Sequence, residues 1–115
     1  MATRYQAFAK VYVAHKDDKT EGAFGNGLLA LLRGVRETGS LNRAAKDMHM
    51  AYSKAWKLMN SAEERFGVQF IERDGARGST LTAEGERLVA AYDAVSKDVN
   101  AYAARRMQEE LAKLS

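Results

Sequence analysis

Polar and basic side chains recur at helical spacing in the segment 52–66 of the sequence. Three of them share one face of the expected helix: Ser53, Lys57 and Asn60. Three more flank that face: Tyr52, Lys54 and Trp56. Side chains of these types hydrogen-bond to base edges in a DNA groove, and lysine also neutralises phosphates. The spacing therefore predicts a surface that reads duplex DNA. A solvated helix face, or a packed flank in the case of Trp56, gives the same pattern.

Two arginines extend this chemistry into a glycine-containing loop. Arg73 ends an expected strand over residues 68–73, and Arg77 stands between Gly75 and Gly78 in the loop that follows. A flexible, positively charged hairpin tip of this kind can lie against the DNA backbone or the minor groove. We expect Arg73 and Arg77 to make such contacts, with Arg77 on a phosphate.

Two residues of the preceding segment complete the predicted DNA-binding set. Ser40 is first of all the expected cap of a short helix, and a helix N-terminus can also hold a phosphate. Lys46, later in that helix, is either a phosphate contact or a solvated charge. The net charge is +3, and basic residues outnumber acidic ones between residues 33 and 79 but not from residue 80 onward. Such a distribution suits a polyanion-binding face in the middle of the chain.

The composition indicates one globular domain without a cofactor. The chain has 115 residues, of which 46% are hydrophobic and 29% are charged. It contains no cysteine, and His15 and His49 stand alone, so we expect no disulfide, metal site or cofactor. No carboxylate pair has a base or nucleophile beside it, so an enzyme is not indicated. The N-terminus lacks a long apolar run, so we expect a cytoplasmic protein without a signal peptide or membrane span.

Hydrophobic periodicity assigns these residues to short elements. The alternating segment Tyr5–Ala14 predicts a strand that pairs with a short strand near Phe24 in an N-terminal hairpin. Asn26 is a candidate cap for the first helix, and Gly39 and Gly67 are candidate helix ends. Three helices are expected: one that follows Asn26 and runs to about Thr38, one over residues 41–48, and one from Ala51 or Tyr52 to about Phe66.

Two short helices joined by a tight turn and followed by a basic hairpin form a winged helix-turn-helix. In this fold the second helix of the pair presents its polar face to the major groove. The small residues Ala44 and Ala45 allow the two helices to approach closely. The expected fold class is mainly α with a small β-hairpin, although a generic three-helix bundle shows the same periodicity.

The order of short motifs adds a family resemblance, which spans roughly residues 24–95. The matching positions are Gly39-Ser40, Ala45-Lys46-Asp47, Tyr52, Ala55-Trp56, Asn60, Glu72-Arg73, Leu81-Thr82, Gly85, Arg87-Leu88 and Tyr92. In these motifs the chain resembles the N-terminal DNA-binding domain of ModE-type, molybdate-responsive repressors and, more distantly, the LysR-type DNA-binding domain. The resemblance implies a winged-helix transcription regulator in which Tyr52 contacts DNA. The loop 74–79 is shorter and poorer in glycine than in that family, which makes a minor-groove contact less secure.

The sequence after Thr82 predicts one helix of roughly 30 residues, with Gly85 as a tolerated interruption. Apolar residues recur along it in a coiled-coil-like stripe: Leu88, Tyr92, Val95, Val99, Tyr102, Met107 and Leu111. A strict coiled-coil repeat would place Arg106 in the stripe, so the apolar positions shift around the helix near that residue. The stripe as a whole predicts a homodimer. The alternative is that this helix packs on the N-terminal hairpin and covers Phe8 and Tyr12. We therefore expect a DNA-binding part over residues 1–81 and a dimerisation helix over residues 82–115.

The leading alternative function is a winged-helix adaptor that binds an acidic protein partner instead of DNA. ModE-type regulators continue into molybdate-binding domains, whereas this sequence ends at Ser115. One helical tail cannot enclose an oxyanion by itself, so we expect a regulator that lacks those domains and binds no small-molecule ligand within this chain. A site built from two chains remains an alternative.

Overall fold

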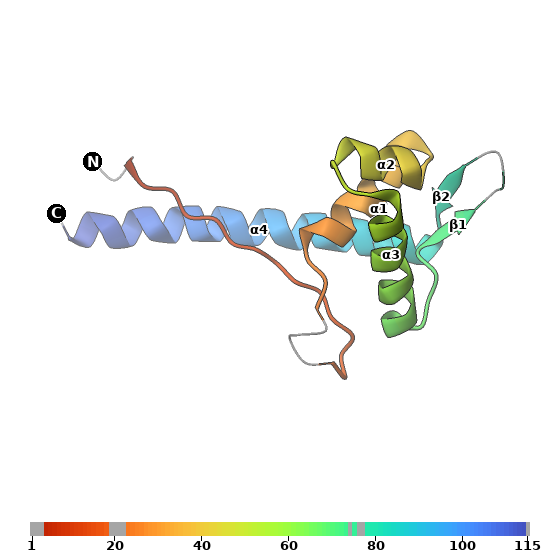
Figure 1. Ribbon diagram of the computed structural model, residues 1–115. Helices are drawn as coiled ribbons and strands as arrows, with labels where there is room; N and C mark the ends of the chain where they lie inside the picture. Colours follow the sequence, from red (N-terminus) through yellow and green to blue (C-terminus); the bar gives the residue numbers. More distant parts are fainter. Residues whose placement is uncertain (1–3, 19–22, 74, 76–77, 115) are drawn as a thin grey trace.

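The computed structural model describes residues 4–18, 23–73, 75 and 78–114, and over these ranges it contains four helices and a two-stranded sheet (Figure 1). The elements are α1 (Asn26–Thr38), α2 (Leu41–Asp47), α3 (Tyr52–Phe66), β1 (Ile71–Arg73), β2 (Ser79–Leu81) and α4 (Ala83–Lys113). This order confirms the predicted mainly α winged helix-turn-helix. The 31-residue α4 projects well beyond the other helices (Figure 1), and the longest extent of the molecule is 60 Å.

The core forms around the apolar face of α1. That helix supplies five buried side chains: Leu28, Leu29, Leu31, Leu32 and Val35. Small residues of the next helices face them, among them Ala44 and Ala45 of α2 and Ala55 of α3, each no more than 2% exposed. Val89 near the start of α4 is also fully buried. Because these partners are small, the three short helices pack closely, as expected from Ala44 and Ala45.

Local sequence signals set most of the helix ends. The Ser40 hydroxyl accepts a hydrogen bond from the Arg43 amide at 3.1 Å, and the Thr82 hydroxyl accepts one from the Gly85 amide at the same distance. Gly39 ends α1 in the left-handed conformation, as predicted. The predicted Asn26 cap is wrong, because Asn26 is the first residue of α1 and Gly25 precedes it without a side-chain cap.

The wing is a short antiparallel hairpin with Ile71 opposite Leu81 and Arg73 opposite Ser79. Its first strand is shorter than the predicted 68–73. The reason is that Glu63 of α3 accepts hydrogen bonds from the amides of Phe70 and Ile71, at 2.8 and 3.2 Å. The amides of Phe70 and Ile71 are therefore bound to a helix side chain, and the Phe70 carbonyl accepts from the Thr82 amide, just after β2, at 2.9 Å.

Within residues 4–18 and 23–25, the predicted N-terminal hairpin is represented by a single antiparallel bridge between Val13 and Phe24. The residues before it run alongside α4 (Figure 1). The amide and carbonyl of Ala9 bond the side chain of Asn100, at 2.9 and 3.1 Å, and Gln108 donates to the Tyr5 carbonyl at 2.9 Å. Because side chains of α4 bond these backbone groups, the segment needs no strand partner to satisfy them.

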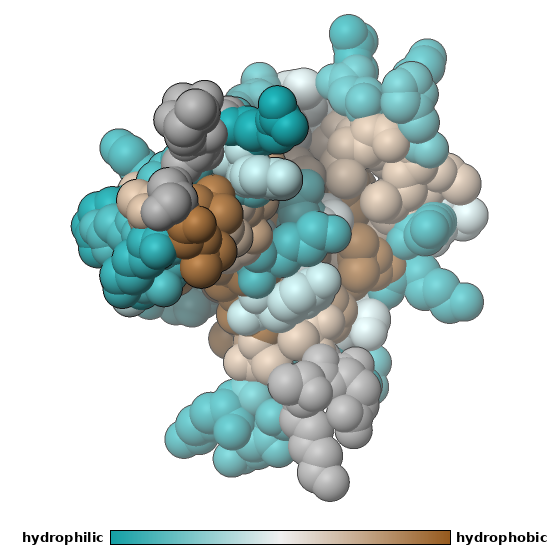
Figure 2. Space-filling model, turned by 90° about the vertical axis from the view of Figure 1, so that its left-hand side faces the viewer, coloured by the Kyte–Doolittle hydropathy of each residue, from teal (hydrophilic) through white to brown (hydrophobic). Residues whose placement is uncertain are grey.

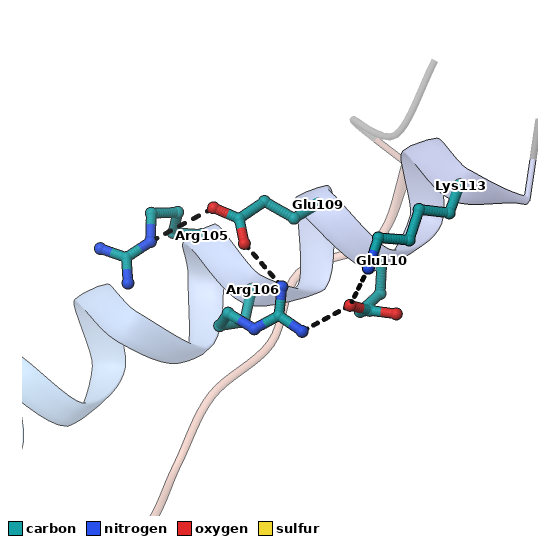
Figure 3. Close-up of polar contacts among 5 residues, drawn as sticks. All are labelled: Arg105, Arg106, Glu109, Glu110 and Lys113. Atoms are coloured by element: carbon teal, nitrogen blue, oxygen red, sulfur yellow. Dashed lines mark hydrogen bonds and ion pairs between the residues drawn. The ribbon is translucent and has the colours of Figure 1, made fainter.

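A network of ion pairs stabilises the far end of α4 (Figure 3). Arg106 bonds both Glu109 and Glu110, Arg105 pairs with Glu109, and Lys113 pairs with Glu110. The hydrogen bond from Arg106 lowers the pKa of Glu110 below its ordinary value, and Lys113 adds to the effect. Acidic residues one turn before or after basic ones support an exposed helix in this way.

Candidate DNA-binding surface

The third helix presents a groove, lined by four polar or basic residues and Trp56, on the side opposite to its buried face. Ala55, Met59 and Ala62 of α3 are fully buried. A groove of about 770 Å³ lies on the other side, lined by Ser53, Lys54, Trp56, Lys57 and Asn60. The structure thus brings together four of the residues predicted to bind DNA, with Trp56 beside them.

The turn before α3 fixes how that helix leaves the core. His49 adopts a positive φ of 57°, and the Met50 amide donates to the Ala45 carbonyl at 2.9 Å. The chain therefore reverses within a few residues, and α3 crosses over α2 as in a helix-turn-helix. His49 lies within this turn.

Two aromatic side chains stand at the start of α3. Tyr52 is 48% exposed, and its ring meets Trp56 edge to face with the ring centroids 6.0 Å apart. Trp56 is partly buried against the hydrophobic core and also lines the groove. The indole therefore packs on one side and borders the groove on the other, and its contact with DNA stays a prediction.

A second pocket connects α3 to the wing. Its volume is about 520 Å³, and it is lined by Trp56, Asn60, Glu63, Gln69, Ile71, Glu72 and Arg73. The Arg73 guanidinium carbon lies 3.3 Å from the centroid of the Trp56 ring, within cation–π distance. The Glu63 carboxylate, which also lines this pocket, accepts hydrogen bonds from two wing amides. No spacing signal in the sequence indicates that role.

The remaining predicted DNA-binding residues lie apart from these pockets. Ser40 caps α2, and Lys46 is exposed in the last turn of the same helix. Arg77 lies outside the described residues. The two pockets therefore gather predicted residues from α3 and β1, whereas Ser40 and Lys46 stand at the two ends of α2 and line neither pocket.

The predicted dimerisation residues of α4 fall into three groups. Tyr92 is only 8% exposed, since it packs in the core of its own chain. Val95, Val99 and Tyr102 are 48%, 37% and 57% exposed and lie within roughly 60° of one another around the helix. Leu88 continues that side, partly buried against the core.

Met107 and Leu111 form the third group, on the side of α4 that carries Asn100. They lie within roughly 20° of Asn100 around the helix axis. Met107 is 38% exposed and Leu111 is half-buried. Figure 2 views the molecule from this end and shows apolar residues at the surface among hydrophilic ones.

The part of the chain that the structure describes contains no group of three or more histidine, cysteine, aspartate or glutamate residues able to hold a metal ion. Among the described helices, none is long and apolar enough to cross a membrane.

Comparison with known proteins gives the family. Residues 27–86 match the family model of the bacterial regulatory helix-turn-helix protein, lysR family. The DNA-binding transcriptional dual regulator ModE of Escherichia coli K12 is 30% identical over 73 residues, 60% of this chain and 28% of that protein. The transcriptional regulator ModE of Yersinia pestis is 35% identical over 69 residues, 56% of this chain and 26% of that protein. The chain thus spans less than a third of the length of these relatives.

Solved structures agree with the sequence matches. The DNA-binding domain of CbnR, in a complex with DNA, is 26% identical, with a TM-score of 0.55, and covers 76% of this chain and 95% of that domain. The LysR family transcriptional regulator CbnR itself is 28% identical, with a TM-score of 0.54, over 63% of this chain and 25% of that one. The expected resemblance to ModE-type and LysR-type proteins is confirmed. The chain belongs to the lysR family of bacterial regulatory helix-turn-helix proteins.

Proposed function

We propose that this chain is a ModE-like regulator of transcription that binds duplex DNA in a sequence-specific way. The observation that carries the proposal is the groove on α3, where Ser53, Lys54, Lys57 and Asn60 stand opposite three fully buried residues of the same helix. An exposed helix with that division can enter a major groove while its other face stays in the core. Similarity to the CbnR domain bound to DNA supports the same conclusion.

The chemistry of each side chain in and beside the groove determines whether it suits a base edge or a phosphate of the DNA. Asn60 offers both a donor and an acceptor, which suits the edge of adenine, and Lys57 suits the acceptors of guanine. Tyr52, Ser53 and Lys54 stand nearer the start of α3, where a hydroxyl or ammonium group reaches phosphate oxygens. Ser40, Lys46 and Arg77 supply further phosphate contacts.

We further propose that two chains associate through α4. Val95, Val99 and Tyr102 expose apolar surface along a part of α4 that leaves the winged-helix core. A partner helix would remove this surface from water. In this arrangement residues 1–81 bind DNA and residues 82–115 pair the chains, so the target has two half-sites about one helical turn apart or a multiple of it.

The test is selection of bound sequences from a random duplex pool, followed by binding measurements on the selected site. Lys57→Ala should cost about 1–3 kcal/mol on that site and relax preference at one base pair. Lys97→Ala, an exposed lysine of α4, is the matched control and should leave binding unchanged. Binding should weaken with salt by about 0.9 log units per log unit of salt for each phosphate contacted.

Two outcomes would contradict the proposal. Absence of duplex binding at low salt would remove the DNA-binding function and favour an adaptor that binds an acidic protein. A uniform loss across all sequences would make Lys57 a phosphate contact and not a reader of bases.

Light scattering at micromolar concentration tests the dimer separately. The unaltered chain should show twice its monomer mass, Val99→Glu should shift it toward the monomer, and Lys97→Glu should not. A monomeric mass for the unaltered chain would refute pairing through α4.

A further inference from the structure

The wing places one arginine directly on the third helix. Arg73 is the last residue of β1, and its guanidinium lies 3.3 Å from the centroid of the Trp56 ring in α3. Both side chains line the pocket between α3 and the wing together with Asn60. Trp56 and Asn60 also border the groove along α3, so the guanidinium stands next to the proposed base-reading residues.

The position of the Arg73 guanidinium is fixed both by the backbone of the wing and by the Trp56 ring. The wing is anchored at its start, where Glu63 holds the amides of Phe70 and Ile71 and the Ile71 side chain is buried. Trp56 is itself held, because its ring meets Tyr52 edge to face and part of it packs against the core. Arg73 therefore extends from a bound backbone onto a bound ring, which restricts the directions in which its guanidinium can point.

The stacked guanidinium keeps its hydrogen-bonding capacity. An arginine stacked on an aromatic face uses the plane of the guanidinium, and the N–H donors at its edge remain available. Among the described residues, no carboxylate forms an ion pair with Arg73, whose side chain is exposed. A rigid fork of donors beside a recognition helix suits the O6 and N7 acceptors of guanine.

We propose that Arg73 reads a base pair beside those read by α3, and that Trp56 is the residue that positions it. The inference rests on the proposed DNA-binding function. It assigns Arg73 a role different from the phosphate or minor-groove contact expected of an arginine in a hairpin wing. The recognition surface then consists of α3 and the end of β1 together.

Three substitutions test this role on the selected site and on a panel of single-base-pair changes. Arg73→Lys keeps the positive charge and removes the planar set of guanidinium N–H donors. Discrimination at one base pair should therefore fall by about tenfold to a hundredfold, while the salt dependence of binding stays unchanged. Trp56→Leu should lose discrimination at the same base pair, and Trp56→Phe should lose less because it keeps an aromatic face. Arg87→Lys, an exposed arginine of α4 paired with Glu84, is the control and should change neither quantity.

The free chain provides a readout that does not depend on DNA. Trp56 is the single tryptophan of the sequence, so its fluorescence reports the stacking directly. Arg73→Ala should change the emission of the folded chain, whereas Arg87→Ala should not. The melting temperature of each variant shows whether the fold is kept, and Trp56→Phe serves where Trp56→Leu unfolds.

Several results would overturn this inference. Equal weakening on every sequence, with a smaller salt slope, would make Arg73 a phosphate contact. Unchanged discrimination in Arg73→Lys would remove it from base reading, and a loss at different base pairs in the Arg73 and Trp56 variants would separate the two residues. Lack of duplex binding by the unaltered chain would instead end the proposed function itself, and this inference with it.

Discussion

Gly85, in the first turn of α4, lies against the backbone that leads into the wing. A Cβ atom at this position would stand 2.3 Å from the Phe70 carbonyl oxygen and 3.2 Å from its carbonyl carbon. That oxygen is held in place, because it accepts a hydrogen bond from the Thr82 amide at 2.9 Å. Gly85→Ala must therefore move α4 away from the residues before β1. The glycine is required by packing and is more than the tolerated interruption expected from the sequence.

Two opposing effects set the size of the change. Alanine stabilises a helix relative to glycine by up to about 1 kcal/mol. Forcing an extra carbon into a packed contact costs about 1–3 kcal/mol, and here the neighbour is backbone, which cannot rotate away. The steric cost is the larger, so we expect Gly85→Ala to lower the free energy of unfolding by about 1–2 kcal/mol.

Gly27→Ala in α1 is the matched control. The nearest atom to its added Cβ is the Leu58 Cδ2 at 3.8 Å, an ordinary contact, so only the helical preference acts. This variant should be more stable than the unaltered chain, by up to about 1 kcal/mol. Urea unfolding followed by circular dichroism, at one protein concentration for all three chains, measures both changes. A Gly85→Ala chain as stable as the unaltered one would refute the argument from the 2.3 Å contact.

Three further substitutions test other contacts. Glu63→Ala should lower the free energy of unfolding by about 1–3 kcal/mol, since two wing amides lose their acceptor, and Glu63→Gln should cost less; urea unfolding measures both. Asn100→Ala should free the backbone of Ala9 from α4 and speed proteolysis before residue 13, with little change in the unfolding midpoint. Because Arg106 lowers the pKa of Glu110, their contact stabilises the helix end above the ordinary glutamate pKa and is lost as the pH falls through the lowered one. Helicity should therefore fall on acidification, and Glu110→Gln should show less of this fall.

The helices and their ends were predictable from local signals in the sequence. Ser40 and Thr82 stand where a hydroxyl can bond a free amide, and Gly39 and Gly67 take the left-handed conformation that ends a helix. Each of these signals acts over a few neighbouring residues, so the local sequence is enough to predict the helix end. Asn26 shows where such local prediction fails. Its side chain is of a capping type, but α1 already begins at this residue, so Asn26 does not cap it.

The N-terminal segment and the wing anchor were not predictable in this way. Alternation in Tyr5–Ala14 predicts a strand, but the backbone partner of Ala9 is the side chain of Asn100, 91 residues away. Glu63 likewise bonds backbone amides seven and eight residues ahead, across the turn into β1. Such contacts depend on tertiary placement, and neither residue type nor spacing identifies them.

The apolar stripe of the last helix lies on two different sides of that helix. Val95, Val99 and Tyr102 lie at least about 100° around α4 from Asn100, which binds the N-terminal segment, whereas Met107 lies near Asn100. The drift of the stripe near Arg106 is therefore a change from one side of the helix to another. Pairing of two chains and packing of the N-terminal segment were alternatives in the sequence, yet the proposed pairing would use a different side of α4 from the one that binds this segment. The segment also leaves Phe8 81% exposed, so its contact with α4 comes from backbone hydrogen bonds and not from the aromatic cover that the sequence suggested.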